Sequence, residues 1–270
     1  MRILIATDGS PEAELAVQLG NEVEQMVGGV VTLLTVIRQP AEWPQADAIL
    51  LRAKSILSAT AAVQTKIRLG QVADEIVNAA RIGQQQLIIV GEQPPHGLVG
   101  RLLAPTAEKV ILQMPGPVLL ARGGIRPLRR VLVCESGREP SLLARLTKQL
   151  APLLCQVDEL TALHVMSQIA AAPGVPGWEL RASADELMEK HTIEGSLLEA
   201  DMARLARLNV RLQAKVRHGL VVREILDEMQ TGDYDLVVIG AHRSKGWERF
   251  LLDDLARELI HHADRPLLVV

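Results

Sequence analysis

Aromatic side chains are nearly absent from this chain of 270 residues, at 2% of the total. Proteins that bind single-stranded nucleic acid rely on aromatic platforms on which the bases stack, so this scarcity disfavours that class of protein. The 48% hydrophobic content is instead that of a globular protein with a sizeable core. We expect that core to consist of leucine, valine, isoleucine and alanine.

An excess of positive charge is also lacking in both halves of the chain. The formal net charge is −3, with 10 basic and 11 acidic residues through Ile125, then 19 and 21 from Arg126 onward. Binding to a phosphate backbone needs a basic patch or stripe. We therefore expect no nucleic acid partner.

Cysteine is scarce, and long apolar runs are missing. The two cysteines, Cys134 and Cys155, lack the spacing of metal ligands and fit a reduced cytosolic protein. No apolar run approaches the ~20 residues of a membrane helix, and the first ten residues read as a strand and turn rather than a signal peptide. We expect a cytoplasmic protein without a membrane association or a metal site.

What the sequence does contain is one pattern that occurs twice. A short apolar strand ends at a glycine and is followed by a loop, a helix and a second apolar strand, at residues 86–122 and again at residues 235–270. One chain of this length can form two ordinary domains. The repeat predicts domains over residues 1–125 and 126–270.

Strands alternate with helices in the first copy. We expect a helix that begins at Pro11 after an N-cap at Ser10 and ends at Gly28. Further helices are expected over 44–62, over 72–82 and around 107–110, and strands over 2–6, 30–37, 63–69, 87–90 and 117–121. This alternation predicts an α/β fold with a parallel sheet that helices cover on both faces.

The second copy repeats the order with one enlarged interval. Strands are expected over 131–133, 160–166, 210–217, 236–239 and 266–270, and helices over 140–154, 221–229 and 255–262. The interval after its second strand is about 20 residues longer than in the first copy. Within this lengthened segment, at about 170–208, the stretch 182–208 predicts one long helix or two shorter ones with a break near Gly195.

These patterns resemble the universal stress protein family in its tandem form. Asp8–Ser10 after the first strand matches the opening signature of the family, and Gly91 with the helix at Ala107–Val110 matches its closing signature. The second copy matches at Val131–Val133, at Leu163–Val165 and from Leu236 to Val270.

The resemblance implies two tandem five-stranded parallel sheets with flanking helices, of the Rossmann-like, adenine nucleotide alpha hydrolase-like type. It also implies dimers in which the last strands meet antiparallel. Here Val118–Ala121 and Leu267–Val270 would pair within one chain, as an intramolecular pseudo-dimer. The sequence leaves open a further homodimer and does not identify a protein partner.

Some members of the family bind ATP through a motif of Gly, two residues, Gly, nine residues, then Gly and Ser or Thr. Glycines let backbone amides close on phosphate oxygens, and the helix N-terminus completes the anion site. The first copy keeps Gly91, but Pro94 stands at the second glycine and Ala104–Pro105 replace the final pair. Because proline has no amide hydrogen, we do not expect a triphosphate to bind here.

The first copy preserves its opening pocket better than its phosphate loop. The resemblance implies that an acid at the position of Asp8 faces the adenosine end of a nucleotide. The candidate pocket residues are Thr7, Asp8, Val36, Gly91 and Gly100. Adenosine, AMP or an unrelated small ligand is compatible with this pocket.

The second copy departs further from the motif. Gly240 is kept, but Arg243 replaces the second glycine and Asp253–Asp254 replace the final pair. A carboxylate ~4 Å from a phosphate would cost about 4 kcal/mol at an effective dielectric of ~20, and these aspartates fit better as helix N-caps. Glu135 would be the opening acid of this degenerate pocket. We expect no cofactor in either copy, and ATP or AMP in the first copy is the less favoured alternative.

The sequence offers no persuasive pairing of a nucleophile with a base. Ser10 follows an acid, but no histidine lies near it in the sequence. We expect His164 to be a satisfied core histidine. A group of acids is expected to form a solvated helix face: Glu186, Glu189, Glu194, Glu199 and Asp201.

These observations favour a non-enzymatic regulatory or interaction module of the stress response, without catalytic residues. The segment at about 170–208 would carry the contact with a partner. The alternative is a protein that senses ATP or AMP through its first domain. A slow hydrolase is a third hypothesis, and it lacks an identifiable base.

Overall fold

The computed structural model describes five stretches of the chain, residues 1–91, 106–135, 141–167, 177–240 and 254–270. The chain divides into two compact units. The described residues of unit 1 are 1–127 without 92–105, together with 264–269, and those of unit 2 are the rest. Among all these residues, none of the helices is both long and apolar enough to cross a membrane.

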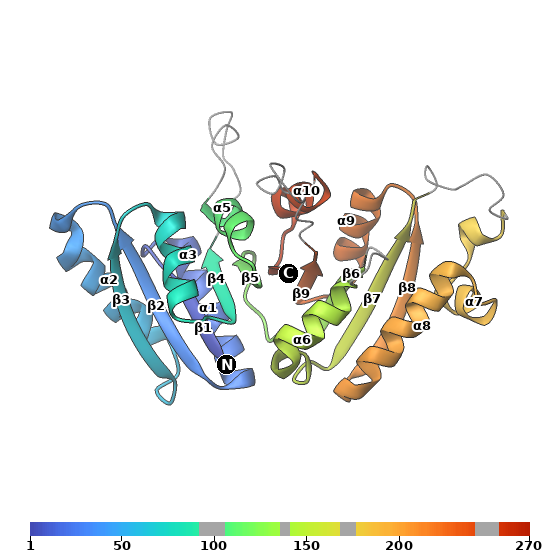
Figure 1. Cartoon of the computed structure of the whole chain (residues 1–270), viewed down its shortest axis with the longest axis horizontal. Helices are drawn as coiled ribbons and strands as arrows, with labels where there is room; N and C mark the ends of the chain where they lie inside the picture. Colours follow the sequence, from blue (N-terminus) through green and yellow to red (C-terminus); the bar gives the residue numbers. More distant parts are fainter. Residues whose placement is uncertain (92–105, 136–140, 168–176, 241–253) are drawn as a thin grey trace. The chain divides into compact units, whose positions relative to one another are not determined.

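Unit 1 alternates strands and helices as the sequence predicts (Figure 1). Its strands in the first repeat are β1 (Arg2–Ala6), β2 (Val30–Ile37), β3 (Ala62–Leu69), β4 (Leu87–Gly91) and β5 (Val118–Ala121). Its helices are α1 (Pro11–Val27), the short 3-10 helix η1 (Pro40–Glu42), α2 (Trp43–Ile56), α3 (Val72–Ile82) and α5 (Thr106–Gln113).

These five strands form a parallel sheet in the order β3-β2-β1-β4-β5. Helices α1 and α2 contact each other, and α3 contacts α5. The central strands are buried on both sides, so residues such as Ile3, Leu4 and Ile5 have no exposed surface. A continuous apolar run is what a strand covered on both faces requires.

Helix α1 begins and ends where its sequence signals predict. The Ser10 hydroxyl accepts a hydrogen bond from the Ala13 amide, and Pro11 occupies the first turn. Gly28 follows the helix with a φ of 64° and donates its amide to the Glu24 carbonyl. Helix α2 differs from its prediction, because it ends at Ile56 and Leu57 is already extended.

The closing strand of the second repeat, β10 (Leu267–Val269), is part of unit 1. It pairs antiparallel with β5, so that Leu267 faces Leu120 and Val269 faces Val118. The antiparallel pairing expected for the two closing strands is therefore observed.

Unit 2 contains four described strands, in the order β9-β6-β7-β8, and all of them are parallel. They are β6 (Arg130–Glu135), β7 (Glu159–Met166), β8 (Arg211–His218) and β9 (Leu236–Ile239). The helices are α6 (Leu142–Leu154), α7 (Ala184–Glu189), α8 (Ile193–Leu205), α9 (Val221–Thr231) and α10 (Asp254–His262), with short 3-10 turns η3 (Glu179–Arg181) and η4 (Ala206–Leu208). Helices α6 and α8 contact each other, and α9 contacts α10.

The lengthened segment forms two helices, which is one of the two predicted arrangements, and the break lies at His191–Thr192, a few residues before Gly195. The chain turns at His191, whose φ of 49° is left-handed, and Thr192 caps α8 by accepting from the Gly195 amide. Gly195 lies in the first turn of α8. A side chain there would collide with the Leu187 carbonyl, so this glycine serves the close approach of α7 and α8.

Candidate functional site

A cavity of about 430 Å³ opens at the carboxyl ends of the parallel strands in unit 1. This edge of a parallel α/β sheet is where such folds bind their ligands. Four of the five residues predicted for the first pocket line the cavity: Thr7, Asp8, Val36 and Gly91. The fifth, Gly100, lies outside the described residues.

Hydrogen bonds fix the turn that leaves β1 at the cavity. The Thr7 amide donates to the Leu34 carbonyl at 2.9 Å, and the Thr35 hydroxyl donates to the Thr7 carbonyl at 2.9 Å. Asp8 then accepts from the Ser10 amide at 3.0 Å through one carboxylate oxygen, which is the local turn that aspartate favours. The turn thereby holds the Asp8 carboxylate at the cavity wall.

Gly91 allows the first turn of α1 to press against the end of β4. A β-carbon at this position would collide with the Glu12 carbonyl and the Ala13 amide. Glycine is therefore required by a close backbone approach. The contact sets the floor of the cavity and fixes where Glu12 stands.

Two charged residues of the cavity wall, Glu12 and Arg38, were missed by the sequence reasoning. Glu12 lies in the first turn of α1, where acids are common because they favour the helix dipole, so its sequence context gave no distinct signal. Its Oε2 atom is buried and has no hydrogen-bond partner within the described chain. The Arg38 amide donates to Glu42, while its side chain is exposed at the cavity.

The remaining wall comes from helices α3 and α5. Val72 and Ile76 supply apolar surface, and Thr106 with Ala107 brings the start of α5 to the cavity. The substituted motif positions Pro94 and Ala104–Pro105 lie outside the described residues. The expected loss of phosphate donors there stays a prediction.

The strand register of unit 2 corrects the alignment of Glu135. Ile3 pairs with Leu87, four residues before Gly91, and Val131 pairs with Leu236, four residues before Gly240. Val131 therefore corresponds to Ile3, so that Glu135 takes the place of Thr7, and not the place of Asp8 as the sequence comparison predicted. The acid that opens the first pocket thus has no described counterpart in unit 2.

Glu135 is buried and bonds to its own unit. Its Oε2 accepts from the Leu143 amide at 3.1 Å, and the Ser141 hydroxyl accepts from the Ala144 amide at 3.1 Å. The N-terminal amides of a helix are a ready anion site. In α6 this site is filled by a carboxylate of the protein itself.

Asp201 lies inside unit 2, so its expected place on a solvated face is wrong. Its exposed fraction is 3%, and Arg204 Nη1 bonds both to Asp201 at 3.3 Å and to the Ser141 hydroxyl at 2.7 Å. Burial, followed by repulsion from Glu135, raises the pKa of Asp201 to about 6. Burial lowers the pKa of His164, and a hydrogen bond to the backbone of Glu135 offsets part of this decrease.

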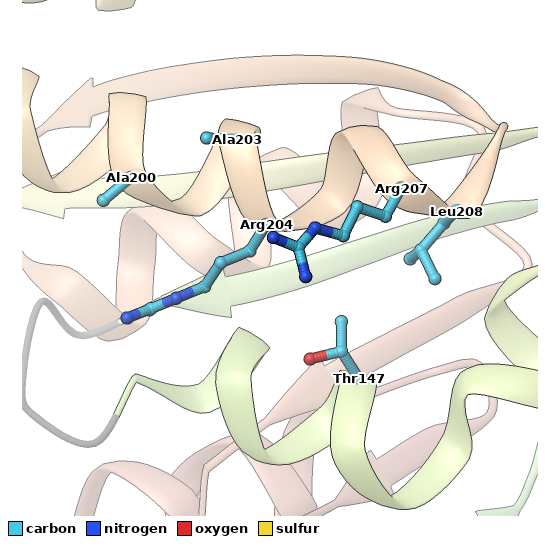
Figure 2. A pocket seen from close by; sticks show the side chains of 6 residues that line it. All are labelled: Thr147, Ala200, Ala203, Arg204, Arg207 and Leu208. Carbon is cyan, nitrogen blue, oxygen red and sulfur yellow. The ribbon is translucent and has the colours of Figure 1, made fainter.

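A second cavity, of about 400 Å³, lies between α6 and α8. Figure 2 shows Arg204 of α8 and Arg207 of the turn η4 on this side of the groove, with Thr147 of α6 facing them. Neither Glu135 nor Gly240 lines this groove. It is a surface groove between helices rather than a counterpart of the first cavity.

Gly240 follows β9 as Gly91 ends β4, but its neighbours differ. A methyl group at Gly240 would meet the tip of the Arg145 guanidinium at 3.0 Å as its nearest neighbour, and no backbone atom comes as close. Arg145 also donates to the Val270 carbonyl at 3.1 Å. Helix α10 begins at Asp254, while Asp253 lies outside the described residues, so their capping role stays a prediction.

The described residues of unit 1 include no histidine. In unit 2, burial raises the pKa of the Cys134 thiol, which disfavours the reactive thiolate. No group of three potential metal ligands occurs in the described part of either unit. What the geometry supports is binding in the first cavity.

Comparisons with known proteins agree with this architecture. The profile of the Universal stress protein family matches residues 1–122 and 127–270. A universal stress protein of Mycolicibacterium smegmatis is 22% identical over 294 residues, covering 99% of this chain and 96% of its own. Universal stress protein MJ0531 of Methanocaldococcus jannaschii is 27% identical over 154 residues, covering 56% of this chain and 86% of its own.

A solved structure shows the same fold over the whole length. The crystal structure of a universal stress protein from Archaeoglobus fulgidus aligns with a TM-score of 0.72 at 16% identity. The alignment covers 99% of this chain and 95% of that chain.

Proposed function

Because the chain belongs to the universal stress protein family and carries the family's unit twice, we propose that it is a non-enzymatic regulatory protein of the stress response whose first unit binds a small ligand. In this proposal unit 2 does not bind the same ligand. Fold alone does not decide function, which is argued from the site.

The observation that carries the proposal is the difference between the two units. In unit 1, Thr7, Asp8 and Val36 line an open cavity. In unit 2, the carboxylate of Glu135 and the pair Asp201–Arg204 occupy the start of α6. Among the described residues, unit 1 therefore presents an open cavity, while the start of α6 in unit 2 is occupied by side chains of the protein itself.

The ligand is proposed to be of nucleoside or mononucleotide size. A cavity of about 430 Å³ falls within the usual range for small-molecule sites. The prolines at 94, 95 and 105 remove amide donors that a triphosphate would need. Adenosine or AMP fits this combination better than ATP does.

Calorimetry on the full chain with adenosine, AMP, ADP and ATP tests the proposal. We expect adenosine or AMP to bind in a one-to-one ratio, and ATP to bind more weakly. Replacing Val36 with tryptophan should fill the cavity and abolish binding. Its register counterpart in unit 2, Val165, provides the control, because Val165→Trp should leave binding intact. Micromolar ATP affinity, or no binding of any of the four, would contradict the proposal.

Pairing of the two repeats within one chain is the second part of the proposal. Its support is the antiparallel alignment of Leu267–Val269 with Val118–Leu120, which brings together the closing strands of the two repeats. A dimer between separate chains would then not be needed to cover this strand edge.

Nucleotide sensing is the second candidate function, and the open cavity favours it. In this version, ligand binding in unit 1 changes the assembly state or the contacts with a partner protein. Light scattering of the full chain with and without AMP separates the candidates, because only the sensing version predicts a change of mass.

The unpaired state of Cys134 and Cys155 supports action in the reducing cytoplasm.

A further inference from the structure

Among the described residues that line the unit 1 cavity, Glu12 carries a buried polar atom that the fold leaves unsatisfied. It lines the cavity from the first turn of α1, and its Oε2 atom is buried without a hydrogen-bond partner in the described structure. An unpartnered buried oxygen of this kind is unfavourable, and native proteins keep few of them. A group from outside the chain would remove the penalty.

A role in stabilising the helix does not account for this position. An acid in the first turn does favour the helix dipole, but an exposed acid would do so equally well. The second repeat has an apolar residue at the same place. Glu12 is the second residue after the N-cap of α1, and the second residue after the N-cap of α6 is Leu143, which is fully buried. The carboxylate is therefore not required to build this turn.

The charges around the cavity favour one class of ligand. Among the described lining residues, Asp8 and Glu12 are acidic and Arg38 is basic, so the wall carries one net negative charge. One Asp8 oxygen is already taken by the Ser10 amide. The remaining acceptors call for hydrogen-bond donors, and they repel an anionic group placed between them.

We infer that the unit 1 cavity selects a nucleoside-sized ligand with an uncharged or cationic donor end, an amino or hydroxyl group that Glu12 receives, over its phosphorylated form. This inference rests on the proposed ligand binding of unit 1. It adds the chemical class of the ligand and names Glu12 as the residue that determines specificity.

Gly91 keeps Glu12 in position for this role. Because the end of β4 lies close against the Glu12 backbone, this contact holds the backbone of the residue at the cavity wall. Arg38 is the one described lining residue that favours a phosphate, and it extends from an exposed position after β2. A ligand held mainly by Arg38 would show the opposite preference, so the two cases are separable by experiment.

The test is calorimetric titration of the full chain with adenosine and with AMP, which differ only by the phosphate. We expect adenosine to bind about tenfold tighter, because its 5′-hydroxyl can donate to Glu12, whereas the phosphate of AMP has replaced that donor and is repelled by the carboxylate. Glu12→Gln should weaken adenosine binding about tenfold and remove most of the preference. Glu14→Gln is the matched control, because Glu14 lies in the same turn and pairs with Arg52 at 2.7 Å outside the cavity wall.

A ligand-free measurement keeps the inference testable if a variant binds nothing. Thermal unfolding of the unliganded chain should show Glu12→Leu melting at or above the wild-type temperature, because leucine removes the buried carboxylate oxygen that has no partner. A lower melting temperature for Glu12→Leu would show that Glu12 serves the fold, and would overturn the inference. Adenosine binding that Glu12→Gln leaves unchanged, or AMP binding as tightly as adenosine, overturns the inference alone. Failure of both ligands to bind overturns the proposed function, and the inference with it.

Discussion

At the scale of single residues, the informative side chains are acids that the sequence presents as ordinary helix surface. Glu12 sits in a first turn and Asp201 in a run of exposed carboxylates, yet one lines a cavity and the other has an exposed fraction of 3%. Neither context could be distinguished by spacing, because burial depends on which helix face meets the sheet. For Glu12 the repeat supplies a comparison, because Leu143 takes the same place in α6.

Replacing Asp201 with asparagine should remove a pH dependence of stability. The folded pKa of about 6 exceeds the usual 3.8, so the folded state holds its proton more tightly and the free energy of unfolding falls as pH rises through this window. The full effect is about 1–3 kcal/mol. Ser141, Arg204 and Glu135 surround the group, while His164, whose pKa is lowered, contributes with the opposite sign.

Urea unfolding of wild type and Asp201→Asn between pH 4.5 and 8 measures this difference. The variant should gain stability relative to wild type as pH rises from 4.5 to 7, because only the wild type must ionise a buried carboxyl. Subtracting the two curves cancels the contribution of His164. Parallel curves for the two proteins would show that Asp201 does not titrate in this range.

The glycines at the ends of β4 and β9 should differ in their tolerance of alanine. A methyl group at Gly91 would collide with backbone atoms of Glu12 and Ala13, whereas at Gly240 it meets the movable tip of Arg145 at 3.0 Å. We expect Gly91→Ala to lower the free energy of unfolding by about 1–3 kcal/mol and Gly240→Ala by less. Denaturant melts of both variants check this, and equal effects would contradict the assigned close approach.

At the scale of elements, the same helix start has been used in two ways. Ser10 and Ser141 both cap the helix after the first strand of their repeat. The cap of α1 stands at an open cavity, while the cap of α6 also accepts from Arg204 and lies beside the carboxylate of Glu135. The difference between the units therefore arises from side chains placed on an unchanged helix frame.

Removal of these two caps should have unequal effects. Ser10→Ala loses one capping bond and should lower the free energy of unfolding by about 1 kcal/mol. Ser141→Ala loses the cap and the 2.7 Å bond from Arg204, so we expect about 2 kcal/mol. Chemical denaturation of the two variants at pH 7 gives the comparison. A larger loss of stability for Ser10→Ala would contradict a stabilising role of the bond between Arg204 and Ser141.

The sequence predicted regular elements well and special turns badly. Helix α3 matches its predicted bounds, Val72–Ile82, because its apolar residues recur at helical spacing between clear end signals. The turn at His191 was missed, since a left-handed histidine has no strong signature. The place of Glu135 was misaligned by one residue, because only the pairing of β6 with its neighbours fixes the register.

At the scale of the whole molecule, the duplicated unit offers a way to protect a strand edge. An exposed edge strand invites pairing with another chain. Strand β5 pairs with β4 on one side and with β10 on the other. The last strand of the chain thus covers an edge that the first repeat would otherwise present to solvent.

Removing residues 264–270 should therefore expose the edge of β5. Its residues Val118–Ala121 are buried in the intact chain, and an apolar edge of that kind is a site for association. We expect the truncated protein to show a higher mass than the full chain by light scattering at the same concentration. Removal of Val270 alone keeps β10 at Leu267–Val269 and should leave the mass unchanged. If the longer truncation also left both mass and stability unchanged, then β10 would have no protective role, because a paired edge and a bare edge would behave alike.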